Sequence, residues 1–138
     1  MVDREVFDRR LEKVEHLLVQ LRTLAEVDKS TFLKDEGLKA QCERWLHLVA
    51  EACIDLANHL IADRGWPAPG SYRESFSTLA ERGVIDEELS ERMERWASLR
   101  NVLVHMYMDI DHEILFEILK NDLDQIEKFA RQMAEFVG

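Results

Sequence analysis

Between residues 100 and 107, in a segment that otherwise reads as a buried helix, lie three side chains suited to acid–base and phosphate chemistry. They are Arg100, His105 and Tyr107, with Asn101 beside the arginine. Histidine suits proton transfer because its unperturbed pKa is about 6.5, and the arginine fork matches phosphate oxygens. Cleavage of RNA without a metal needs a base for the 2′-hydroxyl, an acid for the departing 5′-oxygen and a cation for the charge that develops on phosphorus. The segment is therefore a candidate site for this chemistry.

Arg100 interrupts an apolar stripe, where an aliphatic residue would be expected. An unpaired guanidinium is costly to bury. The simpler structural explanation is an arginine that reaches solvent by its long stem or pairs with a carboxylate from another helix. Tyr107 falls on the same stripe, whereas His105 falls about 140° away on an ideal helix, on a polar stripe with Asn101.

Spacing alone does not place Arg100 and His105 in one pocket. Their convergence requires a distorted last helical turn or a groove approached from both sides. One such histidine per chain is also too few for a separate acid and base. Two protomers facing each other across a two-fold axis would supply two of each group, so we expect a homodimer with a composite site.

Only five glycines and two prolines punctuate the chain, and the long segments between them repeat apolar residues with a period between three and four. That period indicates an all-α fold. We expect an up-and-down bundle of four long helices and one short helix. The expected helices span residues 3–25, 38–62, 71–81, 86–107 and 111 to near the C-terminus, with a turn at residues 30–33.

Several boundaries have local signals. Ser71 and Glu74 form a capping-box pattern that predicts the start of the short helix, and Gly83 is a natural stop for it. Asp86 predicts the cap of the fourth helix, and the last helix is expected to start at Asp111.

The chain of 138 residues predicts a single domain, residues 1–138, which can fold without a metal or disulfide. Its net charge of −10 argues against broad attraction to nucleic acid, so any RNA contact must be local. An apolar run long enough to cross a bilayer and a signal peptide are both missing from the sequence, which predicts a cytoplasmic protein with no membrane association.

Cys42 and Cys53 fall in one predicted helix, about 16 Å apart along its axis at a rise of 1.5 Å per residue. They cannot bridge to each other. Their apolar neighbours predict buried thiols in a reducing compartment.

A second set of polar residues follows a four-residue spacing that invites a metal-site interpretation: Glu43, His47, Glu51, Asp55 and His59. Each four-residue step turns by a further 40° or so, so that only adjacent members meet. We expect a partly solvated face, with no metal and no cofactor. Other polar and aromatic candidates have simpler explanations, with surface positions expected for His16 and His112 and core positions for Trp66 and Trp96, which could otherwise stack on bases.

The pattern of Arg100, four residues, His105, one residue and Tyr107 resembles the signature of the HepT-like toxins, a branch of the HEPN superfamily of small helical ribonucleases. Segments 43–46 and 51–59 resemble the second helix of that family, and Ser71-Tyr72 with Phe76 and Leu79 resembles its third. Together with segment 99–114, the resemblance covers the chain from about residue 40 to 115. The first and last helices agree mainly in pattern.

The resemblance implies a helical homodimeric toxin paired with a small nucleotidyltransferase antitoxin of the MntA type. It makes Arg100 and His105 the ribonuclease pair, with Asn101 in a supporting or substrate-binding role. Tyr107 would be the residue to which the antitoxin transfers AMP.

The leading hypothesis is therefore the toxin of a type VII-like toxin–antitoxin pair, a metal-independent endoribonuclease acting on RNA, with transfer RNA as the candidate substrate. Two alternatives remain. One is a non-catalytic helical module whose groove holds a nucleotide or the partner nucleotidyltransferase, with Arg100 neutralising a phosphate. The other is a structural dimerisation bundle.

Overall fold

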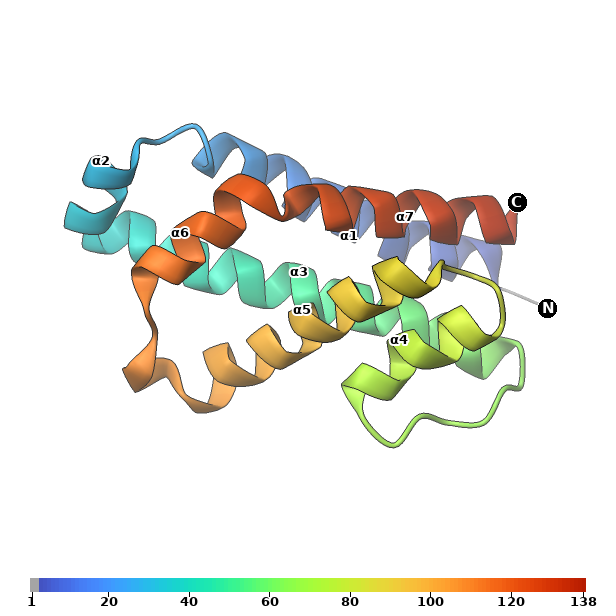
Figure 1. Cartoon of the computed structure of the whole chain (residues 1–138). Helices are drawn as coiled ribbons and strands as arrows, with labels where there is room; N and C mark the ends of the chain where they lie inside the picture. Colours follow the sequence, from blue (N-terminus) through green and yellow to red (C-terminus); the bar gives the residue numbers. More distant parts are fainter. Residues whose placement is uncertain (1–2) are drawn as a thin grey trace.

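The computed structural model describes residues 3–138, which are helical almost throughout and contain no strand. The elements are α1 (Arg4–Leu24), α2 (Lys29–Lys34), α3 (Glu36–Asp63), α4 (Tyr72–Glu81), α5 (Glu87–His105), the 3-10 turn η1 (Tyr107–Asp109), α6 (His112–Asn121) and α7 (Leu123–Val137) (Figure 1). The predicted all-α fold is confirmed.

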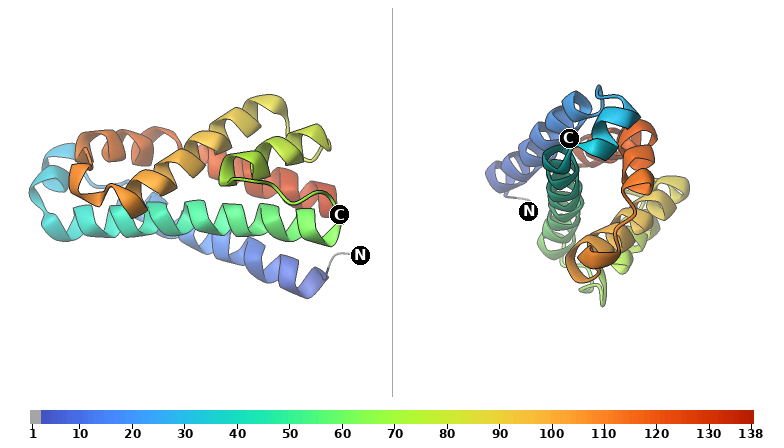
Figure 2. Two further views of the ribbon diagram at one scale, coloured as in Figure 1. Left: turned by 90° about the horizontal axis from the view of Figure 1, so that it is seen from below. Right: turned by 90° about the vertical axis from the view of Figure 1, so that its left-hand side faces the viewer.

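The long helices alternate in direction, so that the two termini lie at the same end of the molecule (Figures 1 and 2). The helix α3 packs against α1, α4 and α5, while α7 lies against α1 and α5. The chain therefore forms the predicted up-and-down bundle, with the short α4 packed beside α5. The carboxyl end of α5 and the start of α6 lie at the end of the bundle far from the termini.

Local caps fix where the helices of the candidate site begin. The hydroxyl of Ser71 accepts a hydrogen bond from the amide of Glu74 at 3.2 Å, which starts α4 at Tyr72. Gly83 has a φ of +74°, a conformation that favours glycine, directly after that helix. The carboxylate of Asp86 accepts from the amide of Leu89 at 2.8 Å and starts α5. These three boundaries agree with the sequence prediction.

Other boundaries differ from the prediction. Residues 29–34 form the short helix α2 instead of a turn, because Asp28 caps it by accepting from the amide of Thr31. Asp35 then caps α3 in the same way, so that this helix begins at Glu36 and not near residue 38.

The predicted continuous last helix is interrupted at Asp122, where φ is −110° and ψ is −2°. Asn121 and Asp122 are weak helix formers. The apolar period passes through the break unchanged, since Leu119 and Leu123 are both buried on either side of it. The sequence pattern therefore carried no sign of the interruption.

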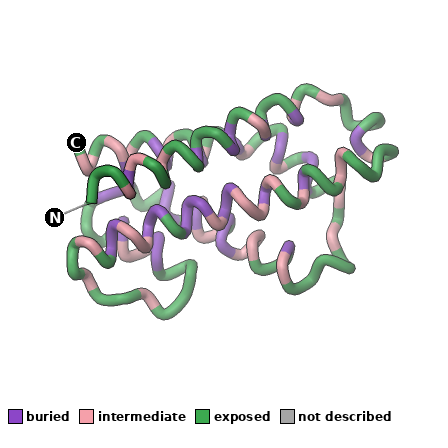
Figure 3. The backbone as a smooth tube through the Cα atoms, turned by 180° about the vertical axis from the view of Figure 1, so that it is seen from behind, coloured by how far each residue is buried: buried purple, intermediate pink, exposed green. Residues whose placement is uncertain are grey.

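The buried side chains form one hydrophobic cluster that runs along the inner faces of the long helices (Figure 3). Cys42 and Cys53 belong to it as free, fully buried thiols, as expected. Burial raises the pKa of the Cys42 thiol to about 12 and also raises the pKa of Cys53. None of the helices in residues 3–138 has the length and apolar character that a membrane crossing requires.

Candidate active site

Arg100 lies on the inner side of α5 and is held from three directions. Its Nε donates to Oε1 of Glu51 on α3 at 2.5 Å, and its Nη1 donates to Oδ1 of Asn101 at 3.2 Å. Its Cζ lies 4.9 Å from the centre of the Tyr72 ring, at the first residue of α4. Only 16% of the side chain is exposed. The sequence left open whether Arg100 pairs with a carboxylate of another helix. Within one chain, the structure shows this pairing.

Glu51 connects two basic groups at the site. The same Oε1 that accepts from Arg100 lies 3.4 Å from Nε2 of His47, one turn earlier on α3. This carboxylate occupies the Nε edge of the guanidinium, and among residues 3–138 no hydrogen bond involves Nη2 of Arg100. The terminal nitrogens are thus the part of Arg100 still able to bind a phosphate.

Asn101 and His105 lie on the outer side of α5, and both are exposed. His105 is the last residue of that helix, because Met106 leaves helical geometry with φ −126° and ψ +33°. In the described part of the chain, neither a hydrogen bond nor an ion pair joins His105 to Arg100. The structure therefore places Arg100 and Asn101 in contact and leaves His105 about a turn away, on the solvent side.

Tyr107 lies in the 3-10 turn η1 and is 65% exposed, between Met106 and Met108, which are 53% and 82% exposed. The prediction that Tyr107 continues the stripe of Arg100 is wrong, because α5 ends two residues earlier. The expectation that its hydroxyl reaches solvent agrees with this exposure.

The spaced set from Glu43 to His59 does not act as one cluster. Glu43 lies 2.8 Å from Nε2 of His112 on α6, whereas Glu51 joins Arg100. Asp55 lies largely at the surface, and partial burial of its carboxyl together with the neighbouring Glu51 raises the pKa of that group. In residues 3–138, no three His, Cys, Asp or Glu side chains are grouped so that they could hold a metal ion.

Sequence reasoning missed two contacts of this face. His112 was expected at the surface, yet it is half-buried against Glu43, and Glu51 was not recognised as the partner of Arg100. The sequence did offer a signal, because one helix carried an arginine on its apolar stripe and another helix carried carboxylates close to its apolar stripe. Spacing within one helix does not show which residues of two helices face each other.

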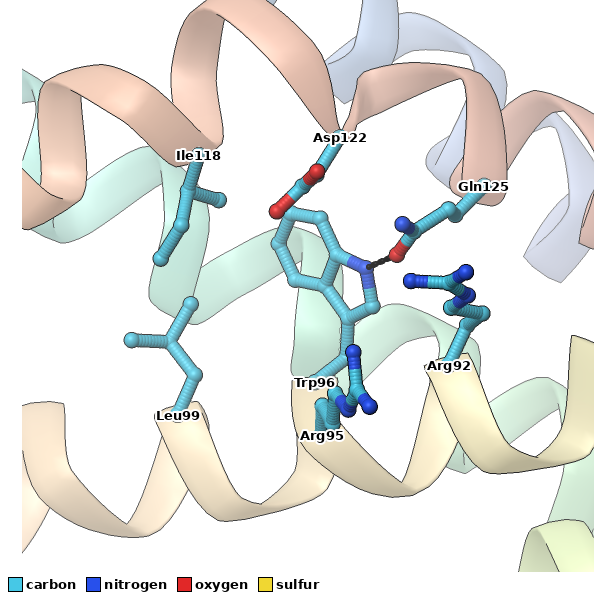
Figure 4. Close-up of a pocket in the computed structure, with 7 residues that line it drawn as sticks. All are labelled: Arg92, Arg95, Trp96, Leu99, Ile118, Asp122 and Gln125. Atoms are coloured by element: carbon cyan, nitrogen blue, oxygen red, sulfur yellow. Dashed lines mark hydrogen bonds between the residues drawn. The ribbon is translucent and has the colours of Figure 1, made fainter.

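A small cavity of about 120 Å³ lies on a different side of α5, between that helix and α6–α7 (Figure 4). The buried Trp96 forms part of it, and its Nε1 donates to Oε1 of Gln125 at 2.9 Å. Trp66 is half-buried against Phe136, with ring centres 6.3 Å apart. Both tryptophans therefore pack into the protein, as expected, and are not free to stack on bases.

Comparisons with known proteins agree with this fold and arrangement. Residues 10–133 match a family model described as ribonuclease HepT-like. The chain is 33% identical to the mRNA nuclease HepT of Shewanella oneidensis over 74% of this chain and 77% of that protein. It is 26% identical to the tRNA nuclease HepT of Aphanizomenon flos-aquae over 96% of this chain and 90% of that protein.

Among solved structures, the fold matches the tri-AMPylated HEPN toxin of Shewanella oneidensis in complex with the MNT antitoxin. The TM-score is 0.87 at 27% identity, over 98% of this chain and 99% of the toxin chain. The fold is thus that of HEPN toxins. The chain belongs to the ribonuclease HepT-like family, as the resemblance of its sequence predicted, and is an enzyme of the ribonuclease class.

Proposed function

We propose that this protein is the toxin of a type VII-like toxin–antitoxin pair and a metal-independent endoribonuclease, with Arg100 and His105 as its catalytic residues. The observation that carries the proposal is the way Arg100 is held. A half-buried guanidinium, fixed at Nε by Glu51 and flanked by Tyr72, keeps terminal nitrogens for a ligand phosphate.

In the proposed reaction, His105 takes the proton of a ribose 2′-hydroxyl, whose oxygen attacks the adjacent phosphorus. The bond to the 5′-oxygen breaks, and that oxygen receives a proton from a second acid, which leaves a cyclic phosphate and a 5′-hydroxyl. Arg100 stabilises the negative charge on phosphorus at the transition state. Asn101 supports this group through its contact with Nη1 and offers a polar side chain to the substrate.

The second acid comes from a partner protomer in this proposal. His105 is exposed and lies at the end of α5, beside the exposed apolar side chains of Val102, Met106 and Met108. An exposed apolar surface of this kind suits a protein interface. Sedimentation at micromolar concentration should give about twice the 16.2 kDa mass of one chain, and a strict monomer would contradict the composite site.

We further propose that an MntA-type nucleotidyltransferase neutralises the toxin by transferring AMP to Tyr107. The phenol oxygen would attack the α-phosphorus of ATP and release pyrophosphate. Support comes from the 65% exposure of Tyr107 and from the AMPylated state of the Shewanella oneidensis relative, which is bound to its MNT antitoxin. AMP would place bulk and negative charge two residues from His105, where it would repel an RNA backbone.

The substrate class in this proposal is RNA, with transfer RNA as the candidate. The relative that aligns over 96% of this chain is named a tRNA nuclease, whereas the relative with 33% identity is named an mRNA nuclease. We place the protein in the cytoplasm because its two cysteines are buried and unpaired.

The alternative of a non-catalytic module depends on Arg100 alone. Arg100 already has a carboxylate partner and makes no contact with His105, so that it would suffice for neutralising the phosphate of a bound nucleotide. Such a module would bind the nucleotide through Arg100, and His105 would not be needed for that binding.

Cleavage of total cellular RNA by wild type, His105→Ala and His16→Ala tests the proposal. His16 is an exposed histidine of α1 and serves as the matched control. Loss of a general acid–base group lowers rates on the order of a hundred- to ten-thousand-fold, so only His105→Ala should be impaired. Equal rates for His105→Ala and wild type would favour the module, and loss of cleavage in excess chelator would contradict the metal-free chemistry.

A further inference from the structure

A cation without a carboxylate partner near the site is informative because the chain as a whole is acidic, with a net charge of −10. Contacts between phosphates and Lys or Arg dominate affinity for nucleic acids. Several arginines of this chain pair with carboxylates, among them Arg22 with Asp124 and Glu127. Arg73, at the second residue of α4, does not.

Arg73 is exposed, and its Nη1 donates to the hydroxyl of Ser98 on α5 at 3.3 Å. In the described residues, no carboxylate oxygen lies within 4.0 Å of its guanidinium nitrogens. The adjacent Glu74 directs Oε2 to the amide of Gly70 at 2.7 Å. The charge of Arg73 is therefore not neutralised by an ion pair.

The partner of Arg73 is a neutral group that binds it weakly. Ser98 donates its own hydroxyl hydrogen to the backbone carbonyl of Glu94 at 3.2 Å and accepts from Arg73. A guanidinium has five N–H donors, so most donors of Arg73 remain for a ligand. A bond to a charged phosphate is about twice as strong as one to a neutral acceptor. A phosphate can thus displace or supplement Ser98.

Arg73 and Arg100 reach the same stripe of α5. Ser98, Asn101 and His105 are separated by three and four residues and so share one side of the helix. Arg73 contacts Ser98, while Nη1 of Arg100 contacts Asn101. These two points lie roughly 4.5 Å apart along the axis at 1.5 Å per residue. Both guanidinium groups therefore approach one side of α5 within about one helical turn.

We propose that Arg73 is a substrate-binding residue that holds a backbone phosphate of RNA next to the phosphate bound at Arg100. The strand would then follow the stripe of Ser98, Asn101 and His105, with Arg73 at the end remote from Tyr107. This inference rests on the proposed function, because it assumes that RNA is the substrate. It assigns a local cationic track to a protein whose overall charge repels nucleic acid.

The test measures the salt dependence of binding and the kinetics of cleavage. The binding probe is a short single-stranded oligodeoxynucleotide, which lacks the 2′-hydroxyl and cannot undergo the proposed reaction. The variants are Arg73→Gln, Arg73→Lys and, as the matched control, Arg131→Gln, which removes an exposed arginine of α7. Circular dichroism establishes that each variant keeps its helical content.

Arg73→Gln should reduce the slope of log affinity against log salt by about 0.7, the value for one single-strand phosphate contact. Its KM for RNA should rise about tenfold with kcat nearly unchanged, since a binding contact is lost. Arg73→Lys should keep the wild-type slope, and Arg131→Gln should match wild type in both measurements.

An unchanged slope and KM in Arg73→Gln would overturn the inference, as would equal losses in Arg131→Gln or a wild type that binds no oligonucleotide at low salt. Failure of the proposed function has a different signature. In that case His105→Ala cleaves RNA as fast as wild type, while the salt slope of Arg73→Gln still decides whether Arg73 binds a phosphate.

Discussion

Oε1 of Glu51 on α3 accepts a hydrogen bond from Nε of Arg100 on α5 at 2.5 Å, and the same oxygen lies 3.4 Å from Nε2 of His47. The carboxylate binds the Nε side of the guanidinium. A phosphate could still bind through the Nη nitrogens. Because both helices are long and packed together, this pair fixes the position of Arg100 in the bundle. Glu51 is therefore a positioning residue in the proposed mechanism.

Replacement of Glu51 should lower the rate of RNA cleavage, and the loss should depend on the residue that replaces it. We expect Glu51→Ala to lose about a hundredfold in kcat, the cost of misplacing a catalytic group by about 1 Å. Glu51→Gln can still accept from Nε and should lose only about tenfold, because a neutral acceptor binds the guanidinium more weakly. Steady-state kinetics measure both values.

The control for Glu51 is Asp55→Asn, one turn further along α3, which removes a carboxylate that makes no bond to Arg100. It should cleave RNA at the wild-type rate. Wild-type activity in Glu51→Ala would show that Arg100 does not need this partner.

Modification by the antitoxin should be confined to one of the two tyrosines of the chain. After incubation with an MntA-type nucleotidyltransferase and ATP, mass spectrometry should find AMP on the peptide that contains Tyr107. Tyr107→Phe should lose the adduct, and Tyr72→Phe should keep it, since Tyr72 is only 37% exposed and lies against Arg100. Silencing of the toxin with Tyr107 unmodified would mean that the partner acts by binding alone.

The cap of α5 should make stability depend on pH. Hydrogen bonds from Gln132, the amide of Leu89 and Lys128 lower the pKa of Asp86 to about 2. A carboxyl with a depressed pKa in the folded state stabilises the protein above its ordinary pKa of 3.8 and loses that contribution as the pH falls toward about 2. Asp86→Ala should lower the unfolding free energy at neutral pH by about 1 kcal/mol.

Urea unfolding at neutral pH and at steps below pH 4 or so measures this effect. The difference in unfolding free energy between Asp86→Ala and wild type should vanish in the acid range. Asp122→Ala is the control, since Asp122 precedes α7 without making a side-chain cap, and burial raises its pKa. A gap for Asp86→Ala that stays constant down to pH 2 or so would contradict the linkage.

Most of the fold followed from the sequence because its causes are local. The caps at Ser71 and Asp86 are short-range hydrogen bonds between neighbouring residues, and the apolar period shows which side of each helix is buried. The break at Asp122 could not be predicted, because the apolar period continues through it. The end of α5 at His105 was missed for a similar reason, since Tyr107 fits the helical period although the chain has already left the helix.

The candidate site was predictable in composition and not in geometry. The residue types of Arg100, Asn101, His105 and Tyr107 identified a segment, and of these four the structure joins only Arg100 and Asn101 by a hydrogen bond. The roles of Glu51 and Arg73 depend on how α3 and α4 face α5. That relationship arises from packing between segments distant in sequence, which no spacing within one helix encodes.

The contact between Glu43 and His112 holds the start of α6, which follows the segment that carries Tyr107, against α3. Residues 106–111 connect two anchored points, the last residue of α5 and the first residue of α6, which is held to α3 by the 2.8 Å contact. This short connection is joined to a helix at each end. In the proposed mechanism, an AMP group on Tyr107 would therefore remain two residues from His105 along a short connection. Transfer of AMP to one exposed phenol would thereby block access of RNA to His105 without a rearrangement of the bundle.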